Sequence, residues 1–229
     1  MTPHARLEPL EWLDELAVAH PQFDADFRAR LRELFAWRRD VRRFKRDALP
    51  AETIERLIEI ACLSPSVGLS QPWRFVIVDG AAARAEIRTC FEACNRDALA
   101  TQAPDRAALY ARLKLAGLDD APTQIAVFAD HATAQGSGLG RLTMPETIDY
   151  SVAIAIHTLW LAARAEGLGV GWVSILDPAR MVEILDVPKD WYFIGHLCIG
   201  YPQAEDDTPV LEREGWEHRQ PPDGMVLHR

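Results

Sequence analysis

The segment RRDVRRFKRD, at residues 38–47, concentrates arginine and lysine in a chain that is otherwise acidic. It stands directly after one predicted helix and before the next, where Arg38, Arg39 and Arg42 could converge on one anion. Planar guanidinium groups form paired, charge-assisted hydrogen bonds with phosphate. One interpretation is therefore a phosphate site, and the alternative is a solvated basic turn whose arginines interact with a helix end.

Asp40 lies among these arginines and also allows two interpretations. As a salt-bridge partner it would stay ionised and chemically idle. As a carboxylate held beside a ligand by the loop that binds phosphate, it could accept and return protons. Both alternatives are compatible with the pattern of residue types.

A second polar segment, SPSVGLSQPWRF at residues 64–75, places hydroxyls, a glycine and two prolines between a predicted helix and a predicted strand. A structural turn accounts for the prolines and for Gly68. Ser66, Ser70 and Gln71 supply more donors and acceptors than a turn requires. Together with the basic segment, they indicate a planar polar ligand that carries a phosphate.

Two glycine-rich stretches, one at Gly136, Gly138 and Gly140 and one at 167–171, do not indicate a dinucleotide-binding fold. Gly167, Gly169 and Gly171 follow a predicted helix and precede a strand, the reverse of the order that a Rossmann fingerprint needs. We expect a helix cap at Gly167 and a close backbone approach near Gly171. Ser174 falls in or just after that strand, where a serine usually bonds to backbone but could also face a ligand.

The elements that must position these residues follow from hydrophobic spacing. Helices are expected at 24–37 and between Pro50 and Pro65, on either side of the basic segment. Strands are expected at 73–78, 125–128, 170–175 and 193–199, and further helices at 81–100, 105–117, 146–166 and 179–185. Without repeats or a clear linker, residues 1–229 are expected to form one α+β domain.

Three segments have special expectations. Residues 131–145 show no periodicity and three glycines, which is typical of a long loop that acts as a lid. The helix at 146–166 is apolar on nearly every side, so it should be buried all round, in the core or at a subunit interface, with His157 as a hydrogen-bonded core residue. The tail at 201–229 is polar and proline-rich and should wrap a surface or a partner subunit.

Composition excludes several classes of protein. Of the 229 residues, 48% are hydrophobic and 26% charged, as in ordinary globular proteins. The net charge of −9 argues against nucleic acid or an anionic membrane as a partner. Acidic residues interrupt any signal-like start, so we expect a cytoplasmic protein with reduced cysteines. Cys90 and Cys94 could form half of a metal site, but simple buried thiols are the favoured interpretation, and no metal is expected.

These motifs together resemble the nitroreductase-like flavoproteins and, within them, the BluB-type aerobic 5,6-dimethylbenzimidazole synthases. The resemblance covers most of the chain, and RRDVR at 38–42, with Asp40 where the wider superfamily has serine, combines with GWVS at 171–174 to indicate the subfamily. The other matching segments are SPSVGLSQPW at 64–73, LKLAG at 113–117, GLGR at 138–141, LWLAARAEGLGVGWVSI at 159–175 and the ELER-type tail that ends in GW at 215–216.

The resemblance implies a nitroreductase-like α+β fold, with a mixed, mostly antiparallel central sheet flanked by helices, in an intertwined homodimer with FMN at its interface. It also implies that reduced FMN, supplied by a separate flavin reductase, is a substrate that O2 fragments to 5,6-dimethylbenzimidazole, the lower ligand of vitamin B12, and erythrose 4-phosphate. Asp40 and Ser174 would transfer protons, under a lid at 131–145. The cofactor-binding residues would be Arg38, Arg39, Arg42, Pro65, Ser66, Gln71, Leu115, Gly171, Trp172, Val173 and Gly200.

Two other functions stay open. The chain could be a conventional NAD(P)H-dependent nitroreductase or dehalogenase-like enzyme that keeps its FMN intact, or a flavin-binding protein without activity. Leu69 stands where many nitroreductases have an asparagine that contacts the flavin, which argues against the conventional enzyme. A closed site would do so as well, because a nicotinamide needs an open face above the ring while dioxygen does not.

Overall fold

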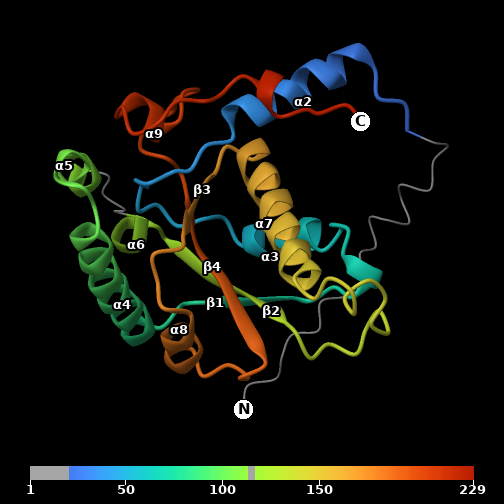
Figure 1. Cartoon of the computed structure of the whole chain (residues 1–229), viewed down its shortest axis with the longest axis horizontal. Helices are drawn as coiled ribbons and strands as arrows, with labels where there is room; N and C mark the ends of the chain where they lie inside the picture. The colour runs from blue at the N-terminus through green and yellow to red at the C-terminus, as the bar shows by residue number, and fades with distance from the viewer. Residues whose placement is uncertain (1–20, 113–116) are drawn as a thin grey trace.

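Four strands form one sheet in the order β1-β2-β4-β3 (Figure 1). They are β1 (Trp73–Ile77), β2 (Thr123–Asp130), β3 (Gly169–Val173) and β4 (Trp191–Gly200), and every pair of neighbours is antiparallel. This computed structural model describes residues 21–112 and 117–229. All four predicted strands are confirmed, and the predicted mostly antiparallel sheet with them.

The two central strands are longer than predicted, by residues 123, 124, 129 and 130 in β2 and by residues 191, 192 and 200 in β4. The buried polar residue Gln124 lies just before the predicted part of β2, whereas His196 lies inside the predicted part of β4. The two side chains bond to one another, with 2.9 Å between His196 Nε2 and Gln124 Oε1, and Gln124 Nε2 donates to the carbonyl of Leu118, while His196 Nδ1 has no partner among the described residues. A buried polar pair of this kind is compatible with a strand once its hydrogen bonds are made.

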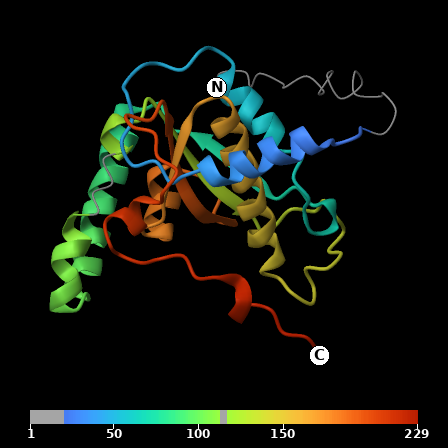
Figure 2. The same ribbon diagram turned by 90° about the horizontal axis from the view of Figure 1, so that it is seen from above.

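Helices cover both faces of the sheet (Figures 1 and 2). On one face, α3 (Thr53–Ala61) and α7 (Thr147–Ala165) share a buried apolar cluster with the strands, in which Leu57, Ile156 and Leu159 are fully buried. On the other face, α4 (Ala81–Ala100) and α8 (Pro178–Ile184) pack through Ile87 and Met181. The predicted α+β arrangement is therefore confirmed.

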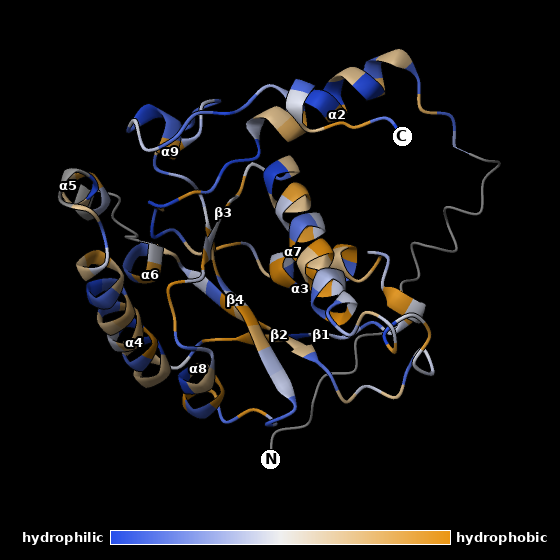
Figure 3. Cartoon of the chain, viewed as in Figure 1, coloured by the Kyte–Doolittle hydropathy of each residue, from blue (hydrophilic) through white to orange (hydrophobic). Residues whose placement is uncertain are grey.

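Within one chain, helix α7 is buried on one side only, whereas the sequence predicts burial all round, in the core or at a subunit interface. Val152 and Ala155 face the sheet with no exposed surface, whereas Tyr150 and Ile154 are 54% and 43% exposed. His157 is exposed as well, so the expectation of a core histidine was wrong for the single chain. Figure 3 shows that α7 is apolar over much of its length. The exposed apolar side of α7 thus has no cover within the described part of the chain.

The remaining helices lie at the periphery. α2 (Ala25–Trp37) crosses the end of α7 and exposes Phe27, Phe35 and Trp37. α5 (Pro104–Arg112) was predicted to extend to 117, but its described residues end at Arg112. The short helices are α6 (Gly117–Asp120), α9 (Val210–Arg213), η1 (Val67–Leu69) and η2 (Pro222–Gly224). None of the helices in the described ranges is long and apolar enough to span a bilayer.

The tail has two parts. The first part, residues 201–216, ends against α5, where the Trp216 ring lies 6.1 Å from that of Tyr110 and 5.0 Å from the guanidinium of Arg106. Beyond that point every residue is exposed, including Met225, Val226 and Leu227. Figure 2 shows this last part extending away from the other elements. The second part of the tail therefore contacts little of its own chain.

Candidate active site

The basic segment forms what we call the arginine turn, residues 38–46, and it lies along the free edge of β3. The Val41 N–H donates to the carbonyl of Val170 at 3.0 Å, and Asp40 forms a parallel bridge with Val170. β3 is the last strand of the sheet, so this edge would otherwise lack a partner. This bridge is parallel, whereas the four strands pair antiparallel, so the sheet together with the bridge is mixed.

The glycines of β3 allow this close approach. A Cβ on Gly171 would collide with the carbonyl oxygen of Val41, and one on Gly169 would lie only 2.6 Å from a methyl carbon of the same valine. Any larger side chain at either position would push the arginine turn off the strand. The predicted close backbone approach near Gly171 is confirmed, and its cause is the contact with Val41.

The Asp40 carboxylate is held by two donors. Oδ1 accepts the backbone N–H of Trp172 at 3.0 Å, and Oδ2 accepts Arg42 Nε at 3.3 Å. Burial raises the pKa of Asp40, and this effect outweighs the lowering by the Trp172 N–H and by Arg42. With 36% of its side chain still exposed, the carboxylate remains accessible. A fixed, accessible carboxyl with a raised pKa is suited to proton transfer.

A cavity of about 400 Å³ separates the arginine turn from residues 203–214. Asp40 and four arginines line it, and among its other residues Thr208 and Gln203 add neutral polar groups. The arginines are Arg39, Arg42, Arg43 and Arg213. Arg39 also has a buried Nε with no partner in the described residues, an uncompensated donor that favours an anion. Asp206 and Glu214 also line the cavity, so four guanidinium groups share it with three carboxylates, and the free donor of Arg39 is the feature that fits a phosphate group.

The three arginines expected to converge on a phosphate take different positions. Arg39 and Arg42 line the cavity, and Arg39 also donates to the carbonyl of Asp207 in the tail. Arg38 lies outside the cavity, over the ring of Trp160 at 4.9 Å. Burial and the proximity of Arg219 lower the pKa of Arg38.

Ser66 and Gln71 lie on another loop, between α3 and β1. Ser66 Oγ accepts the N–H of Gln71 at 3.0 Å, which closes the loop on itself. Leu69 and Gln71 have φ angles of 54° and 42°, a left-handed conformation that is unfavourable for both residue types. Pro65 is exposed at the start of the loop. Strained backbone of this kind is frequent at functional sites.

Within one chain the two groups of candidate residues are apart. The Trp160 indole donates to the carbonyl of Arg39, and the Ser151 hydroxyl accepts the N–H of Val67. Both partners lie on α7, nine positions apart, which corresponds to about 14 Å along a helix. In Figure 1 the arginine turn and the loop after α3 lie at different points along α7. One chain alone does not bring Asp40 and Gln71 into one pocket.

The other candidate residues, on β3 and β4 or next to them, range from buried to exposed. Trp172 packs its ring 6.4 Å from that of Trp160, and Val173 is buried in the opposite cluster. Ser174 follows β3 directly and is exposed. Gly200 is buried where a Cβ would meet Pro122 at 2.6 Å, so packing alone requires a glycine there. Leu115 lies outside the described residues.

Arg213 was missed by the reasoning from sequence. It lines the same cavity as Arg42, and its guanidinium lies 2.8 Å from Asp206. The tail reaches the arginine turn because Lys45 N–H donates to the carbonyl of Tyr201 and Gln203 Nε2 donates to that of Phe44. No spacing within the sequence indicates contacts across so many residues; only the resemblance of the tail that ends in GW at 215–216 gave a signal.

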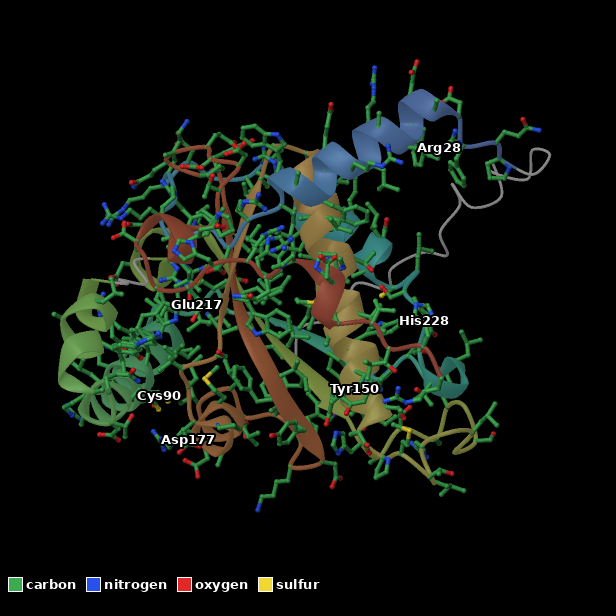
Figure 4. The ribbon with its side chains drawn as sticks, turned by 45° about the horizontal axis from the view of Figure 1, so that its top comes forward. Arg28, Cys90, Tyr150, Asp177, Glu217 and His228 are labelled. Carbon is green, nitrogen blue, oxygen red and sulfur yellow. The ribbon has the colours of Figure 1, made fainter. Side chains whose placement is uncertain are left out.

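Cys90 of α4 lies elsewhere, near Asp177 at the start of α8 (Figure 4). The Asp177 N–H donates to Cys90 Sγ at 3.4 Å, and burial raises the pKa of the Cys94 thiol. In the described ranges no three His, Cys, Asp or Glu side chains gather as metal ligands. Cys90 is a buried thiol and Cys94 is half-buried.

Comparison with known proteins adds relatives of two kinds. The family described as Nitroreductase family matches residues 35–201. A protein of Rhodospirillum rubrum named 5,6-dimethylbenzimidazole synthase is 58% identical over 88% of this chain and 95% of its own length. One of Rhodobacter capsulatus with the same name is 48% identical over 87% and 96%. Among solved structures, oxidized iodotyrosine deiodinase bound to FMN and 3-iodo-L-tyrosine matches with a TM-score of 0.66 at 25% identity, over 77% of this chain and 91% of that one.

Proposed function

Because the chain belongs to the nitroreductase family, we propose that it uses this fold to cleave reduced FMN with dioxygen into 5,6-dimethylbenzimidazole, erythrose 4-phosphate and a fragment that keeps the pyrimidine part of the flavin. Its bacterial relatives of that name assign the chain to the synthesis of the vitamin B12 lower ligand rather than to generic nitroreduction. It is accordingly an enzyme. The reduced flavin reacts with dioxygen and is itself the substrate that is cleaved.

The placement of Asp40 carries this proposal. A salt-bridge partner needs only its arginine, whereas Asp40 is also oriented by the backbone N–H of Trp172 and keeps an exposed share of its surface toward the cavity. Its raised pKa lets it hold a proton at pH values where an ordinary aspartate would not. Asp40 would therefore take up and return the protons that ring fragmentation requires, with Ser174 as a second group for this task.

The arginine turn would hold the phosphate end of the substrate. Arg39, Arg42 and Arg213 offer guanidinium donors around one cavity, and Thr208 adds a hydroxyl. Guanidinium forks match phosphate oxygens in pairs, which gives orientation as well as charge neutralisation. Holding the substrate at this end would leave its ring system beside the β3 residues, Gly171 to Ser174.

The ring would need the second group, Ser66 and Gln71, which one chain keeps apart from Asp40. We therefore propose a homodimer in which each site takes the arginine turn of one copy and the 64–72 loop of the other. The exposed apolar side of α7, with Tyr150 and Ile154, and the apolar residues 225–227 of the tail supply surface for such an interface. An apolar surface of this kind marks interfaces in soluble proteins.

Residues 131–145 would act as a lid over this site. The segment has neither helix nor strand and exposes Leu139 and Leu142 by 73% and 89%. Apolar side chains at a lid would exclude water from the oxygen-reactive ring. A closed lid would also exclude nicotinamide, so a separate flavin reductase would supply the reduced FMN, in the cytoplasm.

The decisive experiment combines the full-length protein with FMN, NADPH, an independent flavin reductase and air. Irreversible loss of flavin absorbance, with the mass of 5,6-dimethylbenzimidazole, is the expected result, and omission of the reductase should abolish it. Direct oxidation of NADPH with intact flavin would instead establish a conventional nitroreductase. Binding of FMN without either reaction would establish a flavin-binding protein.

A further inference from the structure

Gln135, in the 131–145 segment, makes two hydrogen bonds to the loop that carries Gln71. Its Nε2 donates to the carbonyl of Leu69 at 2.7 Å and to Gln71 Oε1 at 3.0 Å. Among the described residues these are the hydrogen bonds that join segment 131–145 to loop 64–72. They connect the proposed lid to a residue proposed to contact the flavin.

The chemistry of the two acceptors determines which way the Gln71 amide faces. The Leu69 carbonyl can only accept, so the atom of Gln135 that faces it must be the NH2 group. The second hydrogen of that group then meets Gln71, which must offer its oxygen. The Gln71 NH2 group consequently points away from Gln135, and it donates to no protein atom in the described part of the chain.

The backbone around this contact fits closely. A Cβ on Gly136 would lie 2.6 Å from the carbonyl oxygen of Gly68, and a Cβ on Gly68 would lie 2.9 Å from that of Leu139. Gly68 itself has a φ of 59°, next to the left-handed Leu69. Segment 131–145 thus packs directly on the strained loop, and this packing fixes the position of Gln135 relative to Gln71.

We propose that Gln135 is a positioning residue, which orients Gln71 so that its NH2 group is presented to the isoalloxazine ring. The carbonyl oxygens of the flavin accept hydrogen bonds and match this NH2 group, whereas an amide oxygen would match only the ring N–H groups. Displacement of the lid would release Gln71 to rotate, so lid position and flavin binding are coupled. This inference rests on the proposed function.

A double-mutant cycle in the full-length protein tests the proposal. Gln135→Ala should weaken FMN binding about 3- to 10-fold, the usual effect of losing one oriented hydrogen bond, and should shift the visible absorption bands of bound FMN. In the Gln71→Ala background the same substitution should change the dissociation constant less than about 2-fold, because its target is gone. Equal effects of Gln135→Ala in both backgrounds would overturn the proposal.

Gln135→Glu gives a second, directional test. A carboxylate only accepts, so Gln71 would turn its NH2 group toward residue 135 and present its oxygen to the flavin. FMN binding should then be weaker than in Gln135→Ala, although the side chain is nearly isosteric. An affinity equal to that of the wild type would contradict the proposal.

The control is Gln102→Ala, which removes a glutamine that donates to the Ala98 carbonyl at the end of α4. It should leave both the affinity and the spectrum unchanged. The two proposals fail in different ways: a wild-type protein that binds no FMN overturns the proposed function and this inference together. A wild type that binds FMN and forms product, with an additive cycle, overturns only the role of Gln135.

Discussion

The Trp172 backbone N–H donates to Asp40 Oδ1 at 3.0 Å, so a carboxylate occupies the hydrogen-bonding position that a neighbouring strand would otherwise take beside β3. The other oxygen accepts Arg42 Nε. The carboxyl group is therefore oriented by the sheet itself, and burial raises its pKa at the same time. Substitutions that preserve or remove these contacts separately distinguish a chemical role from a structural one.

Asp40→Asn should bind FMN within about 3-fold of the wild type but form no 5,6-dimethylbenzimidazole. The amide oxygen can still accept the Trp172 N–H, whereas the proton-accepting carboxylate is lost. Fluorescence titration measures FMN binding, and mass spectrometry of the reaction measures the product. The control is Asp47→Asn, an exposed aspartate near the same turn, and normal turnover by Asp40→Asn would reduce Asp40 to an ion-pair partner.

Arg42→Gln should weaken FMN binding and also raise the pKa of Asp40 further. Arg42 lowers that pKa both by its charge and by its hydrogen bond. If the ionised carboxylate is the active form, the acid limb of the pH profile should move to higher pH. Profiles of kcat, measured with saturating reduced FMN, report this shift.

The comparison for Arg42→Gln is Arg46→Gln, which removes an exposed guanidinium that pairs with Asp120 outside the cavity. Its pH profile and FMN affinity should match those of the wild type. A profile of Arg42→Gln that keeps its position on the pH axis would mean that Asp40 does not set the acid limb.

Gly171→Ala should displace the arginine turn, because the new methyl group would collide with the Val41 carbonyl. Overpacking of this kind typically costs about 1–3 kcal/mol, and here it should also weaken FMN binding. Thermal unfolding and FMN titration together test both effects. Gly224→Ala, where a Cβ meets nothing within 4 Å, should change neither quantity.

The stability of the protein should fall with decreasing pH because of His196. Burial, with the nearby charge of Arg84, lowers its pKa from 6.5 to about 3. Between these values the unfolded chain binds a proton at this position that the folded chain does not. The stabilisation is thus complete above pH 6.5 and is lost as pH falls toward 3.

His196→Gln removes this titration and should flatten the dependence of the unfolding free energy on pH by up to about 1.4 kcal/mol per pH unit. Urea unfolding at several pH values between 7 and 4 measures the slope. The exposed His228 offers a control, since His228→Gln should leave the slope as it is. Equal slopes for His196→Gln and the wild type would contradict the assignment.

Ile154→Glu should give a monomer that binds FMN at least about 10-fold more weakly. The substitution places a charge in the exposed apolar side of α7, where burial against a second copy would leave it unpaired. Light scattering measures the mass, and titration measures FMN binding. Ile77→Glu, at 41% exposure on β1, is the matched control. A stable Ile154→Glu dimer would place the interface elsewhere.

The helices and strands could be predicted from the sequence more readily than the contacts between residues far apart in the chain. The α4 helix matches its predicted bounds, because apolar spacing and the turn before Ala81 are local signals. The position of α7 was predicted correctly. Its exposed side could not be predicted, because an apolar residue such as Ile154 is compatible with burial either in the core or against a partner. Gln124 was left out of its predicted strand because its pairing with His196 is not local.

The candidate site divides in the same way. Asp40 and the arginines were recognised because they share one short motif, and their contacts with β3 follow from the glycines that face Val41. Arg213 and Gln135 were missed because each reaches the site across a long stretch of sequence. A glutamine in a glycine-rich loop carries no signal until its acceptors, Leu69 and Gln71, are known.

The arginine turn along β3 also bears on solubility. An uncovered strand at the margin of a sheet is a template for other chains, and natural proteins block such margins to prevent aggregation. Here the segment that would bind substrate provides the block, through Val41 and Asp40. Variants that detach the arginine turn from β3 should precipitate as well as lose FMN. Bound FMN would hold this segment in place and so reduce aggregation during expression.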